Sequence, residues 1–91
     1  MGIEGVDSRM KEQARLEASP VVMALNVCEL TPGTPKYRDN YRSFTSVMMK
    51  VGTERSMEIV RTFASERRQG EMKDVRNLPA LLMSRLQNWL Q

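Results

Sequence analysis

Histidine is absent from the chain, and cysteine occurs once, at Cys28. Histidine is the commonest general base and a member of most catalytic triads, so its absence disfavours the usual acid–base and nucleophilic enzymes. A single cysteine cannot form an internal disulfide, and without histidine it leaves too few ligands for a zinc site. We therefore expect a protein that is not an enzyme and that holds no metal or cofactor. A lone thiol also indicates a reducing, intracellular compartment, the nucleus or the cytoplasm.

Long apolar runs are missing as well. No stretch approaches the roughly 18 consecutive apolar residues of a membrane span, so we expect no membrane partner. The N-terminal sequence MGIEGVDSRMKEQ has no apolar region typical of a signal peptide. With 41% hydrophobic and 27% charged residues, the chain is predicted to fold rather than to remain disordered. We assign residues 8–91 to a single helical domain and residues 1–7 to a disordered N-terminus, and we expect the domain to be excised from a longer protein.

The alternating pattern of a half-buried strand is also lacking. Helix start signals are present instead, because Ser19-Pro20 and Thr34-Pro35 each place a hydroxyl cap before a proline. Gly52-Thr53 and Gly70 mark helix ends, with Thr53 as the next cap. The predicted fold is all-α, a compact bundle of four to five short helices. The predicted segments are 8–18, 20–30, 35–51, 54–68 and a last helix that Asn77 caps.

The second segment, PVVMALNVCEL, is apolar on nearly every side. A helix of that kind is buried, so we place it at the centre of the bundle. Its three valines leave a strand as the alternative, although the Ser-Pro start favours a helix. Cys28 lies in this segment and is predicted to be a small core residue, because a reactive thiol needs an exposed, electropositive setting.

Positive charge gathers in the later part of the chain. Residues 1–30 carry a net charge of −2, whereas residues 31–91 carry +5. A basic region of this kind favours a polyanion such as RNA, with a merely solvated surface as the alternative. The guanidinium fork fits phosphate well, so arginines dominate the candidate nucleic-acid contacts. These candidates are Arg38, Arg42, Arg61, Arg67, Arg68, Lys73, Arg76 and Arg85.

One of these arginines occupies an unexpected position. Arg85 falls inside the apolar stripe of the last helix, between Leu81 and Trp89. Its guanidinium could extend past the edge of the stripe while the aliphatic part of its side chain packs on the indole of Trp89. Alternatively, Arg85 and Trp89 form an exposed pair that stacks on a base or anchors a partner peptide.

A second functional hypothesis is a protein-interaction domain that engages an amphipathic helix of a partner. Met49 shares a helix direction with Arg38 and Arg42 rather than with the apolar stripe of its segment, so it is predicted to be exposed. The candidate partner contacts are Met49, Arg85 and Trp89. No small-molecule substrate is expected.

The C-terminal part of the chain resembles the last two helices of the N-terminal helical domain of heterogeneous nuclear ribonucleoproteins Q and R. The resemblance covers roughly the last 35 residues, including SMEIVRTFASE, and differs where Leu78, Leu81 and Arg85 replace a lysine, an aromatic and an apolar residue. It implies a helical module that takes part in RNA recognition and protein contacts. The matching positions are Val75, Asn77, Ala80, Leu81, Leu82, Leu86 and Trp89.

Overall fold

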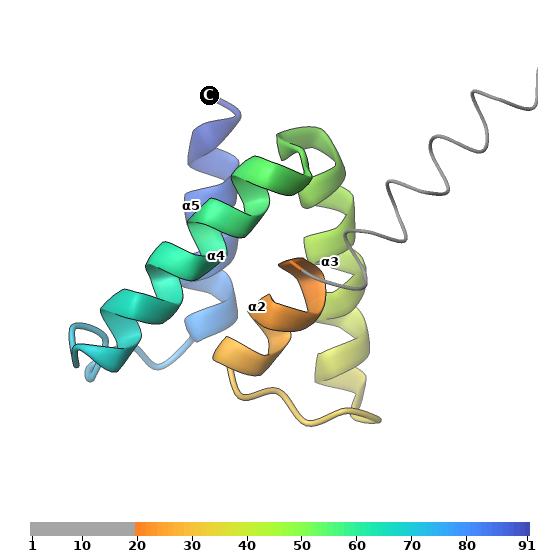
Figure 1. Ribbon diagram of the computed structural model, residues 1–91. Helices are drawn as coiled ribbons and strands as arrows, with labels where there is room; N and C mark the ends of the chain where they lie inside the picture. The colour runs from red at the N-terminus through yellow and green to blue at the C-terminus, as the bar shows by residue number, and fades with distance from the viewer. Residues whose placement is uncertain (1–19) are drawn as a thin grey trace, which may run out of the picture.

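The computed structural model describes residues 20–91, and this part of the chain is a bundle of helices without strands. Helix α2 spans Val22–Val27, α3 spans Pro35–Val51, α4 spans Thr53–Arg68 and α5 spans Leu78–Trp89. Each of these helices contacts the other three (Figure 1). The predicted all-α fold is therefore confirmed, whereas the helix predicted at residues 8–18 and the cap at Ser19 lie outside the described residues.

Local caps explain where α3 and α5 begin. The Thr34 hydroxyl accepts a hydrogen bond from the Tyr37 backbone N–H (3.2 Å), and the Asn77 side chain accepts one from the Ala80 N–H (3.1 Å). Each cap satisfies a backbone donor at the start of a helix, which has no partner within the helix. Both caps were predicted from the sequence and are confirmed.

The junction between α3 and α4 differs from the prediction by one residue. Gly52, with φ of 100°, ends α3 and also stands at the cap position of α4, and Thr53 is already helical. A positive φ carries little penalty in glycine, so Gly52 suits the turn between α3 and α4. The prediction that Thr53 caps α4 was therefore wrong.

The core lies where α2 meets the three longer helices. It contains Ala24 and Leu25 of α2 and Cys28 directly after that helix, together with large side chains of the other helices. The central position predicted for the second segment is confirmed, and the strand alternative is excluded. The fully buried large side chains of residues 20–91 include Leu25, Phe44, Met48, Val60, Phe63, Leu82 and Leu86.

Candidate functional site: a basic groove

A groove of about 1090 Å³ opens between α2, the second half of α4 and the segment 69–77 that leads into α5. The first turn of α3 contributes its edge. We call this surface the basic groove, because its cationic lining residues are Lys36, Arg61, Arg67, Arg68, Lys73 and Arg76.

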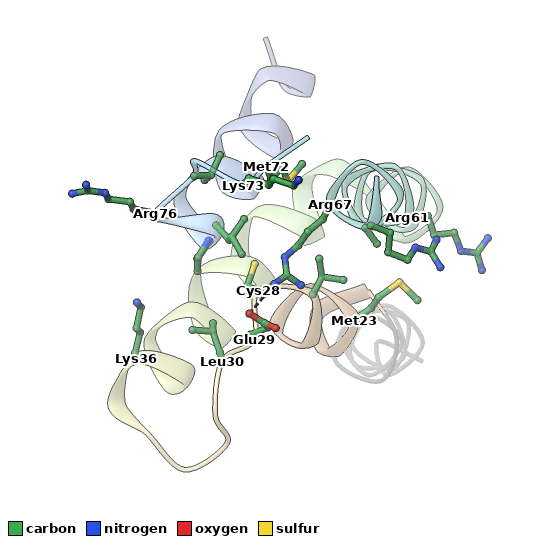
Figure 2. Close-up of a pocket in the computed structure, with 16 residues that line it drawn as sticks. Met23, Cys28, Glu29, Leu30, Lys36, Arg61, Arg67, Met72, Lys73 and Arg76 are labelled. Atoms are coloured by element: carbon green, nitrogen blue, oxygen red, sulfur yellow. Dashed lines mark ion pairs between the residues drawn. The ribbon is translucent and has the colours of Figure 1, made fainter. Parts of the chain in front are cut away.

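The charge balance of the basic groove is uneven. Among residues 20–91, Glu29 is the single carboxylate that lines it, and its side chain forms an ion pair with Arg67 (2.7 Å). Figure 2 shows Arg67 reaching from α4 to Glu29 beside Cys28, with Arg61 and Arg76 on opposite sides. None of the other five cations has an ion-pair partner within residues 20–91. The groove therefore carries a positive charge that this part of the chain does not neutralise.

The backbone conformation at the C-terminal end of α2 places Glu29 at the groove. The Leu30 N–H donates to the Leu25 carbonyl (3.1 Å), and the Glu29 N–H donates to the Asn26 carbonyl (3.0 Å). This pair of bonds is the Schellman motif, which requires a left-handed residue directly after the cap. Glu29 holds that conformation with φ of 57°, although it is not a glycine.

Cys28 lies at the inner wall of the groove. It is only 7% exposed, and burial raises the pKa of its thiol from 9.0 to about 11, while the charge of Arg67 acts in the opposite direction. A thiol with such a pKa carries little thiolate near neutral pH, so it is a poor nucleophile. The prediction that Cys28 belongs to the core is confirmed.

The fold brings together five of the predicted nucleic-acid contacts: Arg61, Arg67, Arg68, Lys73 and Arg76. Lys36 also lines the groove and was missed from the sequence. Its side chain could be assigned there only once the turn between α2 and α3 was known, because Lys36 stands alone at the start of α3. No local pattern in the sequence marks it.

The structure separates Arg38 and Arg42 from the basic groove. They line a smaller hollow of about 330 Å³ on α3, beside Tyr37 and Tyr41. The two tyrosine rings stack there with their centroids 6.3 Å apart. This surface is exposed at both arginines, so it provides a second cationic patch for comparison with the groove.

Arg85 also lies apart from the groove, and its guanidinium binds within the bundle. Both of its terminal nitrogens donate to Glu66 of α4, one of them at 2.9 Å. Its carbon Cζ lies 5.4 Å from the ring centre of Phe63. Hydrogen bonds from Arg85 lower the pKa of Glu66, and the same bonds raise the pKa of Arg85. The arginine in the apolar stripe therefore joins α5 to α4, a contact that neither sequence interpretation described.

The other predicted partner contacts are exposed. Met49 is 42% exposed and Trp89 is 50% exposed, and Leu90 beside Trp89 is 44% exposed. The Arg55 guanidinium covers one face of Trp89, at 3.9 Å from the ring centre. The apolar face of α5 is buried at Leu82 and Leu86 and becomes exposed in the last turn.

The chain matches no model of a known protein family, no curated protein and no solved structure. The resemblance of the C-terminal helices to the ribonucleoprotein domain therefore stays a prediction. Among residues 20–91, no helix has the length and apolarity to cross a membrane, and no three acidic or cysteine side chains are grouped to hold a metal ion.

Proposed function

We propose that the chain is a small helical binding module, not an enzyme, and that its basic groove takes an anionic macromolecule, RNA or another polyanion. The observation that supports this is the gathering of six cationic side chains around one concave surface, where the only carboxylate from the described part of the chain, Glu29, is already paired. Like charges held close together repel each other and oppose compaction, and a bound anion relieves this repulsion. The groove offers no activated nucleophile, because its thiol is buried and protonated near neutral pH.

A salt titration tests the proposal. A labelled single-stranded RNA is titrated with the protein at low and at moderate salt, and the affinity is followed by fluorescence anisotropy. If phosphates are bound, the logarithm of the affinity falls by about 0.7 per log unit of salt for each phosphate neutralised. Polyglutamate serves as a second polyanion, which separates a general preference for anions from one for nucleic acid.

Two matched double variants locate the binding surface. Arg61→Glu with Arg76→Glu reverses charges on opposite sides of the groove, whereas Arg38→Glu with Arg42→Glu makes the same change in net charge on α3. We expect the groove pair to weaken binding and to flatten the salt slope by about 0.7 for each arginine that contacts a phosphate. The α3 pair is expected to change affinity little. Equal losses from both pairs would show that net charge alone matters and would contradict the proposal.

A second candidate function is protein contact through the exposed end of α5, which the exposure of Trp89 and Leu90 favours. Trp89 is the only tryptophan of the chain, so its fluorescence reports on this surface alone. A partner that covers Trp89 is expected to shift its emission to shorter wavelength. A ligand of the basic groove should leave the emission unchanged, because Trp89 does not line the groove.

A further inference from the structure

The basic groove has an apolar floor that a bare polyanion does not use. The residues of this floor are Met23, Val27, Leu30, Met72, Val75 and Leu78. Met72 is 7% exposed, and the other five are half-buried against the core. Covering the remaining apolar area would stabilise a complex roughly in proportion to the area removed from water. A ligand that matches the whole groove therefore needs apolar groups as well as negative charge.

No aromatic side chain of residues 20–91 lines the groove. Proteins that bind single-stranded nucleic acid combine cations with aromatic rings on which the bases stack. All five aromatic residues of this chain lie elsewhere: Phe44 and Phe63 are in the core, Tyr37 and Tyr41 line the hollow on α3, and Trp89 is at the end of α5. The lining thus favours a ligand that presents aliphatic side chains over one that presents bases.

We propose that the ligand of the basic groove is an acidic amphipathic helix of a partner protein, an inference that rests on the anion-binding function proposed above. Its apolar stripe lies on the floor, and its aspartates and glutamates face Arg61, Lys73 and Arg76 on the rim. Helices that dock in grooves place apolar anchors at i, i+3, i+4 and i+7. An extended strand finds no sheet edge to join among residues 20–91, because they form only helices and turns.

The volume of the groove agrees with this ligand. Ten residues of an α-helix, about 10 Å wide and 15 Å long, occupy about 1200 Å³, which is comparable with the groove volume of about 1090 Å³. Met23 and Met72 on the floor are flexible and polarizable, so they adapt to anchors of different shape. By volume, the groove has room for two to three turns of a helix.

Three labelled probes of equal negative charge test the inference. The first is a peptide of about 14 residues, a length at which isolated helices are only marginal in water, with leucines at helical spacing and glutamates between them. The second has the same composition in scrambled order, and the third is a single-stranded RNA. We expect the patterned peptide to bind about tenfold more tightly than either of the others, since burial of a single leucine contributes that much or more.

Floor and rim variants separate the apolar from the ionic contribution. Met23→Ser on α2 and Val75→Ser before α5 are tested singly, and circular dichroism identifies any variant that fails to fold. Each is expected to weaken the patterned peptide by roughly tenfold and to leave the scrambled peptide unchanged. Arg61→Glu with Arg76→Glu should weaken all three probes, and Arg38→Glu with Arg42→Glu should weaken none.

The outcomes distinguish this inference from the function on which it rests. Rim-dependent binding with equal affinities for both peptides, or with RNA bound most tightly, overturns the acidic helix and leaves anion binding intact. A floor variant that folds and still binds the patterned peptide as tightly as wild type also overturns the acidic helix and leaves anion binding intact. If no probe depends on the rim, the proposed function fails, and the inference fails with it.

Discussion

At the scale of single residues, the serine at position 56 is unusual because its hydroxyl is fully buried and has no hydrogen-bond partner among the described residues. A buried polar group without a partner costs roughly 1–3 kcal/mol. Ser56→Ala is therefore expected to raise the free energy of unfolding by about 1 kcal/mol, measured by urea denaturation. Ser84→Ala makes the same change on the exposed surface of α5 and reports helix propensity alone. Equal effects of both variants would show that the buried hydroxyl carries no penalty.

The ion pair between Glu66 and Arg85 predicts a pH dependence of stability. Hydrogen bonds from Arg85 lower the pKa of Glu66 in the folded protein below its ordinary value of 4.5. A depressed pKa stabilises the fold at pH values above the ordinary value, and this contribution is lost as the pH falls through the folded pKa. We expect wild type to be more stable than Glu66→Gln near neutral pH and the difference to shrink in acid. A constant difference between pH 7 and pH 3, followed by urea denaturation, would contradict this prediction.

At the scale of elements, α2 and α4 end with the same hydrogen-bond pattern but with different residues in the left-handed position. Gly70 holds it after α4 with φ of 82°, and Glu29 holds it after α2. The left-handed conformation costs a residue other than glycine about 1–2 kcal/mol. An exposed ion pair such as Glu29–Arg67 contributes less stabilisation than that. Glu29→Gly is therefore expected to raise the free energy of unfolding by about 1 kcal/mol.

Two further variants check the explanation at Glu29. Glu29→Gln keeps the strained backbone and removes only the charge, so its stability should stay close to that of wild type. Gly70→Ala creates the same strain after α4, where the added Cβ would meet the Lys73 side chain at 3.0 Å, so it should lower stability. Destabilisation by Glu29→Gly would show that the ion pair contributes more than the backbone strain costs. These effects are again measured by urea denaturation.

The helices could be predicted from the sequence because their signals are local. The cap at Thr34, the proline after it and the apolar spacing up to Val51 define α3 at both ends, as the structure confirms. Cys28 could be assigned to the core because its segment is apolar on nearly all sides. These features depend on residues within one or two helical turns of each other, and packing did not change them.

The groove could be predicted only in part, because it depends on which helices meet. Arg61, Arg67, Arg68, Lys73 and Arg76 are near one another in sequence, and the fold keeps them together. Lys36 joins them from another helix, whereas the guanidinium of Arg85 binds Glu66, 19 residues away in sequence. No periodicity within one helix indicates a partner on another. The left-handed conformation of Glu29 is likewise not indicated by its residue type, because it is set by the hydrogen bonds that end α2.

At the scale of the whole molecule, the Cys28 thiol is a natural reporter of bundle opening. Cys28 is only 7% exposed at the inner wall of the groove, and α2 contacts α3, α4 and α5, so fast labelling requires α2 to separate from them. We expect slow thiol labelling in native buffer and fast labelling in denaturant. Equal rates would place the thiol on the surface and contradict the packing of α2.

The raised pKa of Cys28 also gives this reporter a defined pH response. Because the pKa is about 11 in the fold and 9.0 ordinarily, the unfolded chain releases its proton first, and stability is lost as the pH rises from 9 towards 11. The loss approaches about 2–3 kcal/mol. Cys28→Ala should flatten this part of the stability profile, and an unchanged slope would contradict the prediction. Lysines and tyrosines titrate in the same range, so the comparison of the two slopes isolates the thiol.

The same reporter connects stability with the proposed function. A ligand that binds only the closed basic groove lowers the population of the open bundle by a factor of one plus the ratio of free ligand to Kd. The rate of thiol labelling should fall by the same factor. At a ligand concentration of about 100 Kd, the expected slowing is about a hundredfold. Arg61→Glu with Arg76→Glu should abolish the protection, whereas Arg38→Glu with Arg42→Glu should preserve it. A ligand that binds tightly without slowing the labelling of Cys28 must contact a surface that stays intact when α2 opens, and the groove between α2 and α4 is not such a surface.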